Sequence, residues 1–202
     1  MTYDPDKHQR RSIRLQGYDY TQAGVYFVTI CTQSCACLFG EAADGEMRLN
    51  DAGQMVEQWW GKLNNKFPGL ETDEYVVMPN HFHGIIIIVG ADLRVCPNPG
   101  AHTGAPLPQI VQWLKTMTTN EYIRRVKSDE WHPFSGKLWQ RNYFDHIIRN
   151  EESLNRIREY IMNNPAQWEF DRENPVGADL RVCPSLGQPH KVVLTKDEPW
   201  RI

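Results

Sequence analysis

The sequence predicts an α+β fold, a ferredoxin-like sandwich in which helices pack on an antiparallel sheet. One observation behind this is the order of its segments, which have the periodicity of strand, helix, strand, strand, helix, strand and helix. Another is the length of 202 residues with 41% hydrophobic side chains, enough for one well-buried domain. Helices alternating with strands in this way favour helices layered on a single sheet.

The elements follow from local signals. β-Branched and aromatic runs predict strands, apolar stripes of helical spacing predict helices, and Asp44-Gly45 predicts a short hairpin or loop within residues 38–49. Asn50 or Asp51 caps the first helix, which stops before Pro68, and Asn150 caps the last one. The strands are expected at residues 25–32, 70–78, 85–89 and 139–149, and the later helices at residues 109–127 and 151–164.

The chain divides into a domain and a tail. Residues 1–170 form the expected domain, and residues 90–108 form an inserted loop in it that contains four prolines and three glycines. Residues 171–202 are charged and contain proline, which predicts a surface tail. No apolar run reaches 18 residues and the N-terminus is polar, so the sequence predicts a cytoplasmic protein that does not enter a membrane.

Charge and cysteine content exclude little. The net charge of -3 does not mark a nucleic-acid binder, although the basic residues are clustered, and such clusters are usually solvated faces. The five cysteines are an odd number, and Cys35-Ala36-Cys37 lacks the spacing of a zinc knuckle. Reduced thiols are therefore expected.

A histidine pair precedes the most apolar strand of the chain. His81 and His83 are two residues apart, so on a strand they share one face while Phe82 lies on the other. Two imidazoles on one face can hold a cation through neutral ring nitrogens. The alternative is one satisfied core histidine beside one exposed histidine. Pro79 cannot donate to a ladder, so the strand should be interrupted or bulged just before His81.

The last helix carries a second pair of polar residues. Tyr160 and Asn164 are four residues apart, which puts a phenol and a carboxamide on the same side of the helix. They lie beside the apolar stripe of Leu154, Ile157 and Ile161. The alternative is a partly buried tyrosine that forms a local hydrogen bond.

Together these segments resemble a known family. Met78-Pro-Asn-His-Phe-His-Gly84 with its isoleucine run is similar to the HUH (His-hydrophobic-His) motif of single-tyrosine transposases, and Tyr160-Ile-Met-Asn-Asn164-Pro165 to their nucleophile helix. Further blocks resemble the REP-associated tyrosine transposase branch: Tyr18-Asp-Tyr20, residues 26–32 and residues 139–149. The resemblance covers about residues 8–168 without the loop at 90–108.

The resemblance implies a role for each site residue. Tyr160 would be the nucleophile, and His81, His83 and Asn164 would be ligands of a divalent metal, Mg²⁺ or Mn²⁺. The implied activity is metal-dependent cleavage and rejoining of single-stranded DNA beside hairpins, through a 5′-phosphotyrosine. A nucleoid-associated monomer or homodimer would act on such DNA. The candidate phosphate contacts are Arg10, Arg11, Arg14, Arg124, Arg125 and Arg141. His146 is expected to be a packed core histidine, outside the metal set.

Two other readings remain open on the sequence. One is a domesticated binder of hairpin or single-stranded DNA that mobilises nothing. The other is a metal-dependent phosphoesterase that uses the histidines while Tyr160 is structural. The sequence separates neither from the transposase, and it does not say whether Tyr160 acts on its own chain's metal or on a neighbour's.

An eight-residue segment occurs twice. Residues 90–97 recur identically as residues 177–184, which is too long for chance and too short for a structural repeat. We interpret both as translated copies of a short repetitive DNA element inserted in frame, and expect surface loops without catalytic roles.

Overall fold

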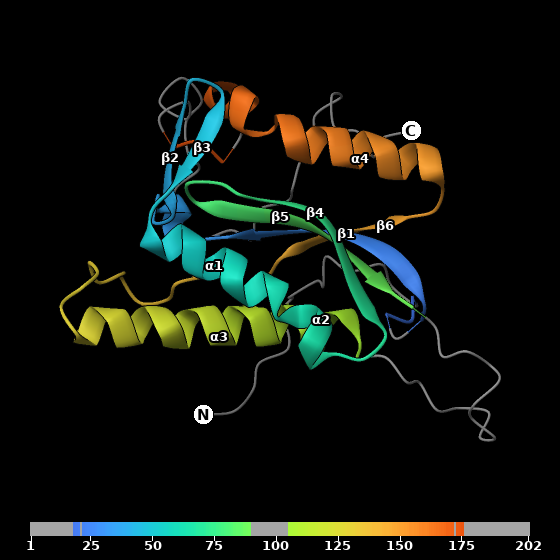
Figure 1. The fold of residues 1–202 in the computed structure, drawn as a ribbon, viewed down its shortest axis with the longest axis horizontal. Helices are drawn as coiled ribbons and strands as arrows, with labels where there is room; N and C mark the ends of the chain where they lie inside the picture. Colours follow the sequence, from blue (N-terminus) through green and yellow to red (C-terminus); the bar gives the residue numbers. More distant parts are fainter. Residues whose placement is uncertain (1–17, 21, 90–104, 172, 176–202) are drawn as a thin grey trace, which may run out of the picture.

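The computed structural model of the chain describes residues 18–20, 22–89, 105–171 and 173–175 (Figure 1). Its main sheet contains four strands in the order β4-β5-β1-β6, and every neighbouring pair is antiparallel. These strands are β1 (Gly24–Cys31), β4 (Leu70–Val77), β5 (His81–Ile88) and β6 (Phe144–Ile148). A separate hairpin pairs β2 (Gly40–Ala43) with β3 (Glu46–Leu49).

Helices cover both faces of the sheet. The helices are α1 (Asp51–Gly61), α2 (Leu63–Lys66), α3 (Leu107–Lys127) and α4 (Glu151–Asn163), with 3-10 turns at Gln33–Cys35 and Pro165–Phe170. α1 and α3 lie on one face and α4 lies on the other (Figure 1). The order of the four strands is that of a ferredoxin-like sheet, so the predicted fold class is confirmed. None of the described helices is long and apolar enough to cross a membrane.

The face covered by α1 and α3 holds the larger core. Alternate residues of β1 point into it, among them Tyr26, Val28 and Ile30, all fully buried. The ring of Trp60 packs on Phe82 with ring centroids 4.7 Å apart. A side-chain carbon on Gly84 would lie 2.7 Å from the Trp60 ring, so this glycine lets α1 approach the sheet closely.

The face covered by α4 holds a smaller core. Phe27 and Ile85 of the sheet pack against Ile157 and Ile161 of the helix, and all four are buried. Buried polar side chains, among them His81 and His83, lie beside this core on the same face. The helical stripe predicted from the sequence therefore anchors α4 over the sheet while leaving room beside it for other groups.

The interruption expected at Pro79 is a hairpin turn. The Met78 amide donates to the carbonyl of His81 at 2.8 Å, which closes the turn between β4 and β5. Pro79 lies between the ends of β4 and β5, so its missing N–H costs no ladder bond. Its carbonyl accepts from the amides of Leu38 and Phe39. The irregularity in the β4–β5 register lies instead between Thr72 and Tyr75.

The last strand is shorter than the predicted residues 139–149. Trp139 forms only an isolated bridge with Thr32, and β6 begins at Phe144. The ammonium of Lys115 holds the intervening stretch by donating to three carbonyls, those of Gln140, Arg141 and Asn142 at 2.6, 3.2 and 3.3 Å. Carbonyls that bind this cation are turned away from a ladder partner, which explains the late start of β6.

Several predictions fall outside the described residues. These are the roles of Arg10, Arg11 and Arg14 and the surface position of both copies of the repeated octapeptide. The expected loop at 90–108 is described only from residue 105, and its end is already helical because α3 begins at Leu107.

Candidate active site and metal centre

The two histidines lie side by side on the α4 face of the sheet. They begin β5, where His81 pairs with Cys31 and His83 pairs with Thr29. His81 is fully buried and His83 is 4% exposed, and their ring centroids are 4.5 Å apart. Phe82 points to the opposite core, as strand alternation predicts.

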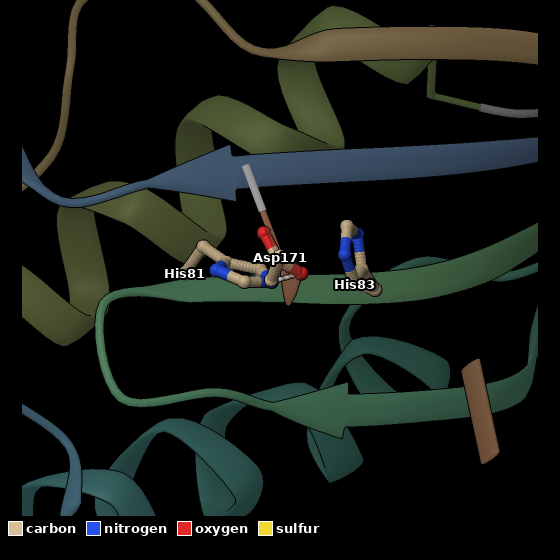
Figure 2. A group of neighbouring side chains, drawn as sticks. All are labelled: His81, His83 and Asp171. Carbon is tan, nitrogen blue, oxygen red and sulfur yellow. Dashed lines mark ion pairs between the residues drawn. The ribbon is translucent and has the colours of Figure 1, made fainter. Parts of the chain in front are cut away.

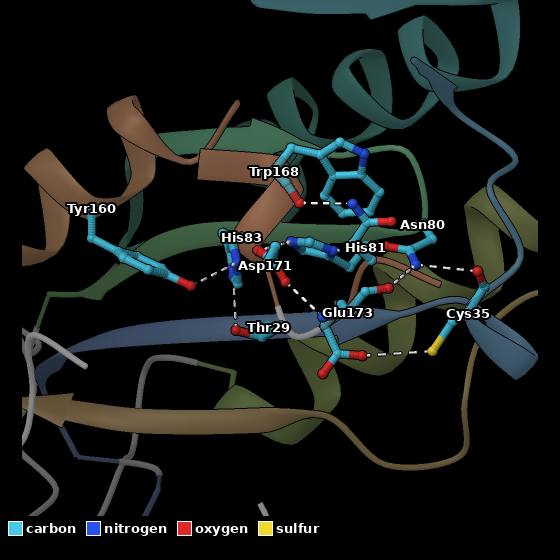
Figure 3. A network of polar contacts seen from close by, with 10 residues as sticks. Thr29, Cys35, Asn80, His81, His83, Tyr160, Trp168, Asp171 and Glu173 are labelled. Carbon is cyan, nitrogen blue, oxygen red and sulfur yellow. Dashed lines mark hydrogen bonds and ion pairs between the residues drawn. The ribbon is translucent and has the colours of Figure 1, made fainter. Parts of the chain in front are cut away.

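Each imidazole is oriented through one ring nitrogen. Nδ1 of His81 lies 2.9 Å from Oδ1 of Asn80, and Nδ1 of His83 lies 2.8 Å from the Thr29 hydroxyl (Figure 3). Since the Asn80 carboxamide oxygen can only accept, Nδ1 of His81 donates and its Nε2 keeps a lone pair. A hydrogen bond on one ring nitrogen that leaves the other facing the site, as in both of these rings, is how proteins prepare histidines to ligate metals.

Burial keeps both histidines neutral. It lowers the pKa of His83 well below its usual value, and the neighbouring His81 adds to the shift. Burial also lowers the pKa of His81, against the opposing effect of Asp171, Glu173 and Asn164. Neutral imidazoles are the form that binds a metal ion.

The carboxamide of Asn164 faces the histidine pair. Asn164 caps the end of α4 and is 1% exposed. Its Oδ1 and the Nε2 of His81 are buried and have no hydrogen-bond partner among the described residues. Buried polar atoms without a partner are costly, so a cation between them would satisfy both.

Tyr160 meets the histidine pair from α4. Its hydroxyl lies 3.5 Å from Nε2 of His83, and the two ring centroids are 5.4 Å apart (Figure 3). The ring also packs edge-on against Phe27, with centroids 6.1 Å apart. One helical turn separates Tyr160 from Asn164, so α4 presents a phenol and a carboxamide to the site together.

An ion pair ties α4 to the sheet. The Arg158 guanidinium donates to both carboxylate oxygens of Asp73, with Nη2 2.5 Å from Oδ2 and Nε 3.2 Å from each oxygen. The guanidinium holds the pKa of Asp73 below its usual value, against an opposing effect of burial. Asp73 lies in the irregular part of β4, so the register shift places this carboxylate under the helix that carries Tyr160.

Asp171 also belongs to this site, and sequence reasoning missed it. It is the first residue of the expected tail, yet its side chain is only 9% exposed and its Oδ2 lies 3.9 Å from Nε2 of His81. Ligand atoms of His81, His83 and Asp171 lie within 4.8 Å of one another (Figure 2). The available signal was a carboxylate shortly after Asn164 and Pro165, where the chain must turn back towards the sheet.

The candidate phosphate-binding arginines do not gather at the site. Arg124 and Arg125 end α3, on the other side of the sheet from α4, and pair with Glu121 and Glu130 (Figure 1). Arg141 is exposed in the stretch held by Lys115. That stretch adjoins the site, because the Gln140 amide donates to the carbonyl of Cys31, the strand partner of His81.

His146 lies on the α4 face but apart from the metal group. It pairs with Phe27 across the sheet and is half-buried, and burial lowers its pKa. It is not part of the histidine–carboxylate group among the described residues.

Comparison with known proteins finds transposases and an uncharacterised relative. Residues 100–164, which include Tyr160 and Asn164, match the family model for IS200-like transposases. The chain is 42% identical over 175 residues to an uncharacterised protein of Haemophilus influenzae, covering 84% of this chain and 96% of that one. It is 22% identical over 156 residues to a second Haemophilus influenzae protein, provisionally named a REP-associated tyrosine transposase, covering 75% and 76% of the two chains.

A solved structure supports the same assignment at the level of the fold. It is that of a REP-associated tyrosine transposase bound to a REP hairpin, with a TM-score of 0.51 and 18% identity, covering 78% of this chain and 74% of the other. At this identity the likeness shows a shared fold, the fold of a tyrosine transposase. Residues 100–164 thus match the IS200-like transposases, a class of proteins that process DNA, and the described chain shares the fold of a tyrosine transposase.

Proposed function

We propose that this protein cuts and rejoins single-stranded DNA at hairpin-associated repetitive sequences, in a metal-dependent transesterification with Tyr160 as nucleophile. One observation carries the proposal: the Tyr160 hydroxyl lies 3.5 Å from Nε2 of His83. A nucleophile and a buried, neutral imidazole that face each other in this way are the two halves of such a site.

The donors present fit a divalent metal ion. His81, His83 and Asn164 supply two imidazole nitrogens and a carboxamide oxygen, and two of these three atoms are buried without partners among the described residues. Mixed nitrogen and oxygen donors suit Mn²⁺, and Mg²⁺ less well. When bound, the ion would polarise the phosphate oxygens of the DNA and help to fix the scissile bond in line with Tyr160.

The chemistry of a phenol explains the choice of Tyr160. As a phenolate it attacks the phosphorus and forms a new P–O bond, while the bond to the 3′ oxygen breaks and that oxygen leaves as a 3′-hydroxyl after taking up a proton. The product is a 5′-phosphotyrosine. Because a phenol has a pKa of about 10, phenolate is also a good leaving group when a DNA 3′-hydroxyl attacks later. Strands are rejoined without an external energy source.

The proposed substrate is single-stranded at the cut and duplex beside it. The phosphate has to reach a site between α4 and the sheet, where Tyr160 faces His83, and this favours an unpaired strand at the cut. The structural relative is described as bound to a REP hairpin, which supports hairpin DNA as the partner. Among the candidate arginines in the described part of the chain, Arg141 is the best placed to contact phosphate, since it is exposed beside the strand partner of His81.

Tyr160 is proposed to act on the metal site of its own chain. The support is that the tyrosine and the histidines of one chain already face each other, so a monomer holds every proposed group. Mixing Tyr160→Phe protein with a His81→Ala, His83→Ala variant tests this. Cleavage should stay absent in the mixture, whereas recovered cleavage would show that two chains share a site.

The decisive experiment uses a labelled hairpin oligonucleotide with a single-stranded flank, incubated with purified protein and Mn²⁺. We expect a covalent protein–DNA adduct that resists denaturation and disappears in Tyr160→Phe. Tyr75→Phe is the matched control, because Tyr75 packs on Trp60 on the α1 side of the sheet. Tight binding without an adduct would instead indicate a DNA-binding protein that does not mobilise DNA. Cleavage surviving in Tyr160→Phe would indicate a phosphoesterase.

A further inference from the structure

We propose that Asp171 is an additional, anionic ligand of the metal, supplied by a turn that closes over the histidine pair. The C-terminal turn is defined here as residues 168–171 and 173–174. This inference rests on the proposed function, since it assigns one more ligand to the same metal site. It differs from the ligand set of His81, His83 and Asn164 by adding a full negative charge.

The first argument is the direction of the carboxylate. Oδ2 of Asp171 lies 3.9 Å from Nε2 of His81, too far for a hydrogen bond, although His81 is fully buried and the Asp171 side chain is largely so (Figure 2). Nε2 of His81 therefore keeps no hydrogen-bond partner among the described residues. Two polar groups that are withdrawn from solvent and face each other without bonding leave a place for a third, and a cation suits a lone pair on one side and a carboxylate on the other.

The second argument is that the turn holds Asp171 in this orientation. The Asp171 amide donates to the carbonyl of Trp168 at 3.1 Å, and the Asn174 carboxamide donates to the same carbonyl at 2.9 Å. Oδ1 of Asp171 accepts from the Glu173 amide at 2.7 Å. One carboxylate oxygen is thus used to fix the side chain, and the other is left to face His81.

The third argument is the residue that joins the turn to the histidines. The carboxamide of Asn80 accepts from Nδ1 of His81 at 2.9 Å and donates to the carbonyl of Glu173 at 2.5 Å and to that of Cys35 at 3.1 Å (Figure 3). Asn80 is fully buried, and these contacts satisfy both ends of its carboxamide. It therefore orients one proposed ligand and fastens the turn that carries another.

The added carboxylate changes the charge and affinity of the site. Two imidazoles and a carboxamide are neutral, whereas Mg²⁺ and Mn²⁺ favour anionic oxygen ligands. With Asp171 the chain would offer four ligands, and a six-coordinate ion would keep two positions for phosphate oxygen or water. The charge on Asp171 would then contribute to the affinity for the ion. Removing this charge would leave the position of Tyr160 unchanged.

Manganese binding to the full chain tests this directly, without DNA. Isothermal titration with Mn²⁺ should show binding about 10-fold or more weaker in Asp171→Asn and Asp171→Ala than in the unsubstituted protein. Glu169→Gln is the matched control, an exposed carboxylate two residues earlier, and should leave the affinity unchanged. Glu173→Gln removes a nearby carboxylate that contacts Cys35, and should weaken Mn²⁺ binding less than the Asp171 variants do. Circular dichroism melting checks that each variant folds.

The outcomes separate this inference from the proposed function. Unchanged Mn²⁺ affinity in both Asp171 variants, with affinity lost in His81→Ala, would overturn the role of Asp171 and keep the histidine site. Unchanged affinity in His81→Ala and His83→Ala as well would remove the metal centre itself. If Asp171→Asn fails to fold, Asp171→Ala and the two glutamate controls still decide the matter. If both Asp171 variants unfold, Asp171 holds the fold, and the ligand assignment is wrong.

Discussion

The two faces of the central sheet are built from different side chains, although they share the strand β5. On the α1 and α3 side, Phe82 and Ile86 join a continuous apolar core. On the α4 side, His81 and His83 lie beside a core of only a few apolar residues. Strand alternation makes this division possible, because consecutive residues point to opposite faces. The comparison indicates that one face supplies most of the stability while the other tolerates buried polar groups that chemistry requires.

The largest effect should come from a substitution in the core on the α1 and α3 side of the sheet. Trp60→Ala removes a buried ring that packs on Phe82, and we expect a loss of about 3–5 kcal/mol in the free energy of unfolding. Urea denaturation measures it. A loss this large is not expected for Tyr160→Phe, which keeps the ring on the other face. Equal losses for both variants would break the distinction between the two faces.

Low pH should destabilise the protein through the two histidines on the α4 side of the sheet. The pKa of each site histidine is lowered in the folded protein, so the unfolded chain binds protons first as the pH falls. Stability is therefore complete above the unfolded pKa of about 6.5 and is lost below it, by up to about 1.4 kcal/mol per pH unit for each histidine. Denaturation midpoints between pH 7 and pH 5 measure this slope.

A matched variant assigns the slope to the site. His83→Gln should flatten the curve between pH 7 and pH 5, whereas His132→Gln, a change at an exposed loop residue, should not. A slope that survives His83→Gln undiminished would mean that the half-buried His146 or another group causes the acid sensitivity.

A methyl group added to β5 on the α1 side should test whether the two faces respond separately. Gly84→Ala puts a carbon 2.7 Å from the Trp60 ring, on the side away from the histidines. We expect about 1–3 kcal/mol of destabilisation from overpacking. Thermal melting measures it, and Gly61→Ala, where nothing lies within 4 Å, is the control. If the variant folds, Mn²⁺ affinity should change little, because the histidines lie on the opposite face.

The smallest stability effect should come from the ion pair under α4. Asp73→Asn leaves Arg158 without its charge partner, and partial exposure limits the expected loss to about 1 kcal/mol. Adduct formation should fall more than stability does, because the pair holds the helix that carries Tyr160. Mn²⁺ affinity should be unchanged. A charge-swapped Asp73→Arg, Arg158→Asp variant should recover part of the rate if the pair positions α4, and none of it if Asp73 acts in another way.

Local patterns in the sequence determined the elements and half of the site. Period-two alternation placed His81 and His83 on one face, and helical spacing placed Tyr160 beside Asn164, because both depend only on near neighbours in the chain. The order of the segments was enough for the fold class. Only the family resemblance predicted that the two pairs of residues meet. In the structure the Tyr160 hydroxyl lies 3.5 Å from Nε2 of His83.

Only the tertiary structure decided the contacts between segments far apart in the chain. Asp171 lies 90 residues from His81, and Arg158 lies 85 residues from Asp73, so no local spacing could pair them. The sequence also could not place Arg124 and Arg125 on the layer away from α4, since charge clusters carry no information on which face they occupy. Local preferences fix where strands and helices form, but the folded sheet decides which side chains meet across it.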